Sequence, residues 1–261
     1  MIAYARNGHT DKFGIPRQSR EESPILTRIV FEPEYNVAEA LRGIEGYSHL
    51  WLIWGFSEVD TWSPTVRPPR LGGNKRMGVF ATRSPFRPNP IGLSSVRLIA
   101  VRLNSQCTIH NSQLGDKSAD RDFEISNSGI PECPESGRME LIVSGADVLD
   151  GTPIYDIKPY LSFSDSHPEA KNGFAEETKD YHLEVEWQVE GTTIIAEDKG
   201  KSLGLPRDTK DAITYILAQD PRPAYQDDPR REYKMDYDGY VVTFFVECAR
   251  IIVKKVEKRD K

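Results

Sequence analysis

The sequence has few of the residues that form disulfide frameworks or metal sites. Its 261 residues include three cysteines, none in C-x-x-C spacing, and five scattered histidines. An odd number of cysteines without paired spacing favours free thiols in a reducing compartment over a disulfide scaffold or a structural zinc site. We therefore expect a cytoplasmic protein that binds no metal.

Long apolar runs and the glycine pattern of a common nucleotide-binding fold are missing as well. No apolar run approaches the roughly 20 residues of a membrane-spanning helix, and the start, MIAYARNGHT, does not resemble a signal peptide. No Rossmann glycine motif follows a first strand, so a nucleotide-like cofactor would have to bind in another way. We expect a protein outside the membrane, with one large domain or two of ordinary size.

Acidic residues are absent from one long segment of an otherwise acidic chain. The net charge is −6, yet residues 61–103 contain no Asp or Glu and eight basic residues: Arg67, Arg70, Lys75, Arg76, Arg83, Arg87, Arg97 and Arg102. Electrostatic steering depends on where charge lies rather than on its sum. The segment therefore indicates a basic face for a polyanion or an anionic ligand, although a proline-rich surface connection with solvated arginines is the alternative.

The most informative stretch lies inside this segment, at residues 77–93, MGVFATRSPFRPNPIGL. Proline fixes φ and biases the residue before it toward extended conformations, so the arginines at 83 and 87 lie in a stiff, non-helical loop. Such a loop can hold guanidinium groups in place for an anion or a polar ligand.

Short runs of β-branched and aromatic residues predict strands at residues 25–31, 49–56, 77–82 and 92–103, the last with an irregularity near its middle. The run HLWLIWGF at 49–56 is almost entirely apolar and predicts a central strand buried on both faces. One short helix is expected between Asn36 as N-cap and Gly43. Many short strands with one helix predict a mainly β fold, a barrel or a sandwich.

The composition of the residues after 103 divides the chain into two expected domains. Residues 104–138 are polar and predict an extended loop insertion, the strand pattern resumes at 139–161, and a charged linker follows at 165–180. We expect a first domain at 1–164 and a small α+β domain at 181–261. Its predicted elements are a half-exposed strand at 182–189, a helix at 208–220 with one apolar stripe, and one or two final strands.

Four stretches together resemble one known family: FGIPRQ at 13–18, the 32 residues at 63–94, DGTPIYDIKPYL at 150–161 and LAQDPRPAY at 217–225. In sequence and order they are similar to the TsaA-like family, which includes tRNA methyltransferases that modify N6 of threonylcarbamoyladenosine at position 37 with S-adenosyl-L-methionine (AdoMet). The resemblance implies a dimeric β-barrel catalytic domain, whose cofactor pocket is built from loops, and a small C-terminal domain.

The resemblance also maps cofactor contacts onto this chain. They fall on Pro16, Arg17 and Gln18, on Arg83 and Leu93, on Ser144, Gly145, Ala146 and Asp147, and on Ser57 and Glu58. Relatives often carry His-Gln at the last pair, so only backbone contacts or a carboxylate–ribose contact are expected there. By chemistry, Arg83 suits the methionine carboxylate and Gln18 an adenine or methionine end. Their alternatives are a surface salt bridge and an ordinary loop residue.

Three further residues are candidates for catalysis. Asp156 and Lys158 lie two apart, hence on one side of an extended strand, and form either a structural ion pair or a catalytic carboxylate held by a lysine. Tyr225 follows the PRP sequence that ends the predicted C-terminal helix, and its ring is suited to stacking on an anticodon-loop nucleotide.

For RNA contact we select Arg67, Arg70, Lys75, Arg76, Arg87 and Arg222. The RPPR sequence at 67–70 also resembles a polyproline ligand, and Arg222 also fits a simple helix stop. The favoured function is AdoMet-dependent methylation of tRNA, with the anticodon loop as partner. The alternatives are a non-catalytic AdoMet- or RNA-binding module and a proline-motif interaction protein.

Overall fold

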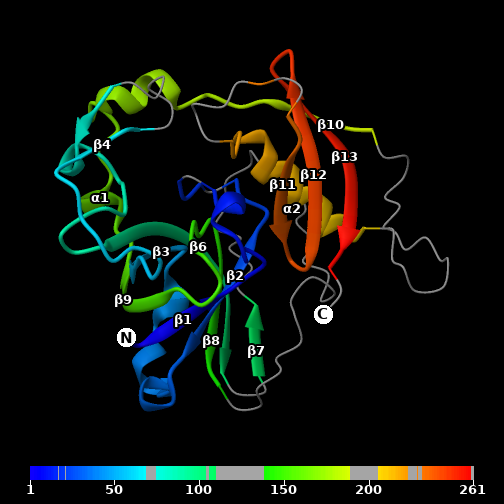
Figure 1. Cartoon of the computed structure of the whole chain (residues 1–261). Coiled ribbons are helices and arrows are strands. Elements are labelled where there is room, and N and C mark those ends of the chain that lie inside the picture. Colours follow the sequence, from blue (N-terminus) through cyan, green and yellow to red (C-terminus); the bar gives the residue numbers. More distant parts are fainter. Residues whose placement is uncertain are drawn as a thin grey trace.

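Antiparallel strands dominate the computed structural model, which describes residues 1–16, 18–20, 22–68, 75–103, 106–109, 138–188, 205–222, 228 and 231–259. Six strands close into a barrel in the order β3-β9-β1-β2-β8-β6, because β6 also pairs with β3 (Figure 1). They are β1 (Ala3–Arg6), β2 (Leu26–Phe31), β3 (His49–Gly55), β6 (Ile91–Leu103), β8 (Glu140–Ser144) and β9 (Pro153–Pro159). The predicted mainly β barrel is confirmed.

The barrel core follows from the two-residue alternation of its strands, which sends every second side chain inward. The buried side chains include Ala3, Ala5, Ile29, Leu50, Leu52, Trp54, Val96, Leu98, Leu141, Val143 and Ile154. At 13 residues, β6 is long enough to pair with β3 through its first half and with β8 through its second. Its register shifts between Leu98 and Ala100, so the predicted irregularity is confirmed.

Two strand predictions need correction. The strand β3 alternates between buried and half-buried residues instead of being buried on both faces, because one of its faces forms the outside of the barrel. Residues 77–82 form only the two-residue strand β5 (Met77–Gly78), which pairs with β4 (Thr65–Val66), followed by a 3-10 turn at Val79–Ala81. The guanidinium of Arg87 donates to the carbonyls of Val79 and Thr82 and thereby holds that turn.

The predicted helix after Asn36 is also wrong. The segment contains only 3-10 turns, at Pro33–Tyr35, Ala38–Leu41 and Ile44–Gly46. The side chain of Asn36 does not cap a helix, because its oxygen accepts a hydrogen bond from the Met139 backbone N–H at 2.7 Å. A long-range contact has therefore replaced the local one that the sequence suggested.

The predicted 104–138 loop begins with a strand, β7 (Gln106–Ile109), which pairs with the end of β6. Most of that loop lies outside the described residues. Beyond the barrel, the chain forms a short helix α1 (Ser162–Asp165) and a 3-10 segment at Gly173–Thr178. Among the helices in the described part of the chain, none has the length and apolar character needed to cross a membrane.

A second sheet in the order β10-β13-β12-β11 forms the C-terminal part, drawn in orange and red in Figure 1 except for the yellow β10. Its strands are β10 (Glu184–Trp187), β11 (Tyr233–Tyr237), β12 (Tyr240–Glu247) and β13 (Arg250–Lys258). The helix α2 (Arg207–Ala218) buries Ala212, Ile213, Ile216 and Leu217 in the same core as the sheet. This confirms the predicted apolar stripe, the half-exposed strand, which is β10, and the final two strands, whereas β11 was missed.

The loop between β1 and β2 joins the two parts of the molecule. Phe13 stacks on Tyr233 with ring centroids 6.5 Å apart, the Asp238 N–H donates to the Gly8 carbonyl at 2.9 Å, and Ile25 belongs to the C-terminal core. The same loop contains the FGIPRQ motif. The C-terminal sheet therefore supports a loop that the family resemblance assigns to the cofactor.

Candidate cofactor and nucleic-acid site

Three segments that are far apart in the sequence meet at one end of the barrel. From the proline-rich loop, Arg83 donates a hydrogen bond from Nη1 to Oε1 of Gln18 at 2.8 Å. Both side chains are exposed. The structure thus brings together two of the predicted cofactor residues, and it gives Arg83 a neutral amide partner rather than the carboxylate of a surface salt bridge.

The third segment contributes Asp147, just after β8. One of its carboxylate oxygens, Oδ1, accepts a hydrogen bond from Ser94 Oγ at 2.5 Å. Burial raises the pKa of Asp147, whereas the Ser94 hydrogen bond, the charge of Arg83 and the Ser19 backbone N–H act in the opposite direction. The positive charge of Arg83 therefore acts on a carboxyl group that is largely removed from water.

Backbone contacts fix the spacing between these segments. Ser19 Oγ donates to the Ser95 carbonyl on β6 at 2.7 Å. Gly145 has a φ of +86°, and a Cβ on it would lie 2.7 Å from the Arg20 carbonyl oxygen. Only glycine combines this backbone conformation with so close an approach. The Ser144–Asp147 segment is therefore packed directly on the loop of Gln18.

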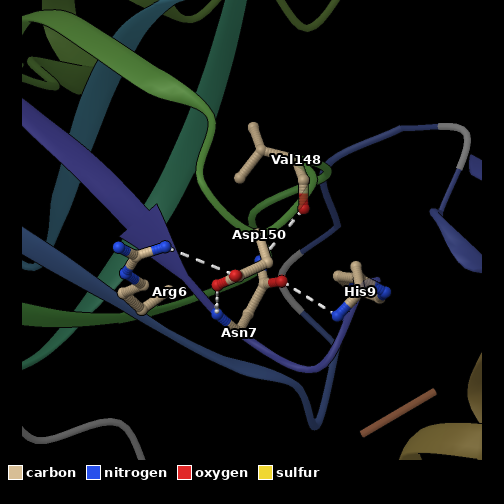
Figure 2. A network of polar contacts seen from close by, with 5 residues as sticks. All are labelled: Arg6, Asn7, His9, Val148 and Asp150. Atoms are coloured by element: carbon tan, nitrogen blue, oxygen red, sulfur yellow. Dashed lines mark hydrogen bonds and ion pairs between the residues drawn. The ribbon is translucent and has the colours of Figure 1, made fainter. Parts of the chain in front are cut away.

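A polar network that includes Val148 and Asp150 ties the chain after β8 to the start of the β1–β2 loop (Figure 2). Asn7 donates through Nδ2 to the Val148 carbonyl at 3.0 Å and through its backbone N–H to Asp150 Oδ1 at 3.1 Å. Its side-chain oxygen accepts from the His9 N–H at 2.9 Å, and the Asp150 N–H donates to the His9 carbonyl at 2.9 Å. The turn at Asp150 and Gly151 is thus anchored to the start of the β1–β2 loop.

Leu93 and Asp156 lie on the outer face of the same barrel wall. Leu93 is opposite Ile53 on β3, and Asp156 is opposite Ile53 from the other side, on β9. Directly paired residues on neighbouring strands point to the same face, and each strand step is about 4.8 Å. Leu93 is 53% exposed. An exposed apolar side chain and a carboxylate therefore share this surface, two strand steps apart.

The predicted pair of Asp156 and Lys158 is formed. Lys158 Nζ lies 2.9 Å from Asp156 Oδ2, and the side chains are 61% and 47% exposed, respectively. The other carboxylate oxygen accepts from the Ile157 backbone N–H at 2.9 Å. An ion pair this exposed contributes little to stability. Because nearly half of the Asp156 side chain is exposed, a substrate can reach its carboxylate.

The structure gives fewer contacts for the remaining predicted cofactor residues. Pro16 is buried, Ser57 is exposed after β3, and Glu58 forms an exposed ion pair with Lys12 at 3.3 Å. Arg17, predicted to bind the cofactor, Arg70, predicted to bind RNA, and Tyr225, predicted to be catalytic, lie outside the described residues. Within the described ranges, no group of three or more His, Cys, Asp or Glu side chains is arranged to hold a metal ion.

The basic segment divides into exposed cations and structural ones. Arg67, Lys75 and Arg76 are exposed, and Arg76 donates to Thr65 Oγ1 at 2.9 Å. Arg87 is occupied by the turn carbonyls described above. Arg102 lies 2.6 Å from Glu140, a buried carboxylate that also accepts from Arg28 at 2.7 Å. Fewer than eight basic side chains are therefore available to form the basic face that the charge count predicted.

Arg222, predicted to contact RNA, forms a bidentate ion pair just after α2. Its Nε and Nη2 donate to the two carboxylate oxygens of Asp220 at 2.8 and 3.1 Å, and the side chains are only 11% and 12% exposed. Burial, the largest single contribution, raises the pKa of Asp220, but the hydrogen bonds from Arg222 and Tyr181 bring it below its usual value. This geometry favours the helix-stop interpretation, and RNA contact stays a prediction.

The sequence interpretation missed Ser94, Trp54 and Ser19. Ser94 and Trp54 point into the barrel, and Trp54 Nε1 donates to Ser94 Oγ at 2.8 Å. The available signal was the alternation along β6, which places Ser94 on the inner face beside the exposed Leu93. That signal identifies the face but not the partner, because Asp147 is 53 residues away.

Comparison with known proteins agrees across both parts of the chain. The tRNA-methyltransferase O N-terminal domain matches residues 4–124 and 125–166, and the TrmO C-terminal domain matches 180–259. A tRNA (adenine(37)-N6)-methyltransferase of Eikenella corrodens is 40% identical over 212 residues, which are 80% of this chain and 97% of that protein.

A Pseudomonas aeruginosa protein named as a candidate S-adenosylmethionine-dependent methyltransferase, RcsF, is 38% identical over 89% of this chain and 85% of its own. The crystal structure of TrmO from Pseudomonas aeruginosa superposes with a TM-score of 0.64 at 30% identity, covering 98% of this chain and 96% of that one. The sequence resemblance is thereby confirmed over nearly the whole length: the chain belongs to the tRNA-methyltransferase O family.

Proposed function

We propose that this protein transfers the methyl group of AdoMet to N6 of threonylcarbamoyladenosine at position 37 of tRNA. The observation that carries the proposal is the convergence of Gln18, Arg83 and Asp147 at one barrel end, in a chain whose two halves both match the family. The relatives described above are a tRNA (adenine(37)-N6)-methyltransferase and a candidate S-adenosylmethionine-dependent methyltransferase.

The residues at the barrel end fit the chemistry of AdoMet. Its methionine end carries a carboxylate and an ammonium group, and its sulfonium is positive. The Arg83 guanidinium suits the carboxylate, Gln18 can both donate and accept, and Asp147 offers a carboxylate to positive charge. When bound, AdoMet supplies an electrophilic methyl group, so the main task of these residues is to hold it in line with the nucleophile.

The target nitrogen is a poor nucleophile, because its lone pair is delocalised into the adenine ring and the carbamoyl group. A base that accepts its proton would assist the transfer. Asp156 is our candidate for this base, because it is accessible on the same outer face as Leu93 and is held by Lys158. Tyr225 is proposed to stack on a nucleotide of the anticodon loop.

The exposure of Arg67, Lys75 and Arg76 supports proposed contacts with tRNA phosphates, and Arg70, which lies outside the described residues, is proposed to make the same contact on the basis of the sequence. Arg87 is proposed to support the turn that follows these cations. The proposed domains are 1–164 for cofactor binding and 181–261 as a smaller unit, joined by the linker 165–180. Contacts of the C-terminal sheet with the β1–β2 loop support a role for the smaller unit in cofactor binding.

We further propose that the protein is a cytoplasmic homodimer. Several large apolar side chains are exposed in or near the 63–94 segment, among them Trp62, Phe80, Phe86, Ile91 and Leu93. Ile91 and Leu93 share the outer face of β6. A contiguous exposed apolar face typically marks an interaction surface. Light scattering that gives the mass of one chain, at the concentration used for activity, would contradict the dimer.

The test of the proposed function is transfer of a labelled methyl group from AdoMet to tRNA. We expect label in a nucleoside of tRNA that contains threonylcarbamoyladenosine, and none in the same tRNA prepared without that modification. A non-catalytic AdoMet- or RNA-binding module would bind one or both ligands and leave the tRNA unlabelled, which would contradict the proposal.

A further inference from the structure

A chain of three side chains runs from the barrel interior to the cofactor site. Trp54 Nε1 donates to Ser94 Oγ at 2.8 Å, and Ser94 Oγ donates to Asp147 Oδ1 at 2.5 Å. An indole N–H can only donate, so the Ser94 oxygen accepts and its own proton is directed to Asp147. The chain therefore has one polarity, and it ends on a carboxylate as acceptor.

Packing holds the first member of this chain in place. Trp54 is buried, and its indole covers Gly92, where a Cβ would lie 2.3 Å from the ring. The ring also contacts Phe56 in an edge-to-face arrangement with centroids 4.4 Å apart. Gly92 and Ser94 are alternate inward residues of β6, so one strand provides both the space for the indole and the acceptor for its N–H.

We propose that Ser94 and Trp54 are positioning residues that hold Asp147 as an ionised hydrogen-bond acceptor, directed at the positively charged part of AdoMet. The proposal rests on the proposed function, because it assigns a role to two residues behind that cofactor site. Neither residue is one of the cofactor contacts that the family resemblance maps onto this chain.

The surroundings of Asp147 support this role. Burial, the largest contribution, raises the pKa of its carboxyl above the usual value, and four contributions oppose it: the Ser94 hydroxyl from β6, the Asp147 backbone N–H, the Arg83 guanidinium from the proline-rich loop and the Ser19 backbone N–H from the β1–β2 loop. Loss of the Ser94 hydroxyl removes the largest of these four. The carboxyl then takes up a proton at a higher pH and no longer attracts a cation.

The experiment is titration of AdoMet into the folded protein by calorimetry across the pH range in which each variant stays folded. In the wild-type chain we expect AdoMet affinity to fall on acidification, with a midpoint that reports Asp147. In Ser94→Ala the midpoint should move upward by about one to two pH units, the scale of one hydrogen bond to a charged group. Trp54→Phe keeps an aromatic ring but removes the indole N–H that donates to Ser94, and it should move the midpoint less, in the same direction.

Two comparison variants make the result specific. Asp147→Asn, which is neutral at every pH, should remove the pH step. Thr243→Val removes the hydroxyl of another buried residue, in the C-terminal sheet, and should leave the midpoint unchanged. A Ser94→Ala protein that binds AdoMet more weakly at every pH with an unmoved midpoint would overturn the positioning role and leave a packing role. A wild-type chain that binds no AdoMet at any pH would overturn the proposed function itself, a different result.

Discussion

Two arginines in proline-containing segments behave differently in the structure: Arg83, two residues before Pro85, and Arg222, between Pro221 and Pro223. Arg83 reaches across to Gln18, a neutral residue 65 positions away, and remains exposed. Arg222 reaches back two residues to Asp220 and is almost covered. The first arginine forms no ion pair closer than 4 Å with the described residues and acts on the Asp147 carboxyl only through its charge, and the second neutralises a carboxylate at the end of a helix.

The difference indicates where charge is available for function. A guanidinium bonded to an amide keeps its full charge for an anionic ligand, whereas one in a covered bidentate pair would have to abandon a buried carboxylate to bind anything else. We therefore expect changes in the Arg83 region to alter binding and catalysis, and changes in the Arg222 region to alter stability.

The largest effect is expected at Asp156, an exposed charge on the barrel. Asp156→Asn should reduce the single-turnover rate of methyl transfer by about 100-fold or more, the usual scale for loss of a general base. Affinities for tRNA and AdoMet should stay nearly the same. A normal rate in the folded variant, with only a lower unfolding temperature, would return Asp156 to a structural ion pair. The exposed Glu184→Gln is the matched control.

The next largest effect is expected at His9, in the β1–β2 loop, which lies between the barrel and the C-terminal sheet. Its ring is buried against Tyr237, and neither ring nitrogen has a hydrogen bond of normal geometry to the described residues. Burial, opposed by the Gly14 backbone, lowers the pKa of His9 from 6.5 to about 4. Between those two pH values the unfolded chain binds the extra proton, so stability falls as the pH falls.

The His9 contribution amounts to up to about 3 kcal/mol between pH 6.5 and 4, at 1.36 kcal/mol per pH unit. Burial also raises the pKa of the neighbouring Asp238, and this shift makes the unfolding free energy rise as the pH falls. The effect of His9 is therefore measured as the difference between the variant and the wild-type chain. His9→Gln should show a flatter dependence of unfolding free energy on pH than wild type in urea titrations. The exposed His182→Gln should follow wild type, and equal slopes for all three chains would contradict the assignment.

Arg222→Ala tests the covered pair. It leaves Asp220 without its main partner, and we expect a loss of about 2 kcal/mol in unfolding free energy, less than the roughly 3–5 kcal/mol of a fully buried pair. AdoMet affinity should not change. Arg207→Ala, an almost fully exposed cation at the start of α2, is the control. Unchanged stability together with weaker binding of modified tRNA would favour RNA contact at Arg222 and break the comparison.

Arg83→Ala tests the exposed member of the comparison. Loss of one charge-assisted interaction should weaken AdoMet binding by about 1–3 kcal/mol, measured by calorimetry, with little change in unfolding temperature. Arg42→Ala, an exposed arginine in the turn segment before β3, should bind AdoMet normally. A folded Arg83→Ala protein with wild-type affinity would remove Arg83 from the cofactor site.

The smallest effect is expected for single exposed cations of the basic segment. If Lys75 contacts a phosphate, Lys75→Ala should flatten the log–log slope of tRNA affinity against salt by about 0.7–0.9 and weaken all tRNAs alike. Filter binding at several salt concentrations measures the slope. A slope near zero in the wild-type chain would mean that these cations serve the cofactor or a subunit contact.

Local patterns predicted the elements that local chemistry determines. The spacing of apolar residues along β6 predicted the strand and its irregularity, and the stripe on α2 predicted its buried side. The failures are places where a distant residue decides the outcome. Asn36 looked like a helix cap but binds the backbone of Met139. The YKMDYDGY sequence that forms β11 does carry alternating large residues and a turn signal, and both were overlooked.

The candidate site shows the same limit. The family resemblance named Gln18, Arg83 and Asp147, but only the closed barrel shows that they meet. The supporting residue Ser94 depends on the register of β6 against β3 and on the path of the chain after β8, and neither is written in local sequence. The charge count predicted a wide basic face, because it could not show that Arg102 is directed at Glu140.

The central claim is that AdoMet binds at the barrel end formed by the β1–β2 loop, the proline-rich loop and the segment after β8. Hydrogen–deuterium exchange with and without AdoMet tests it most directly. We predict slower exchange in peptides that contain Gln18–Arg20, Arg83 and Ser144–Asp147, and no change in the strands of the C-terminal sheet. Protection confined to the C-terminal sheet, or none under saturating AdoMet, would contradict the account.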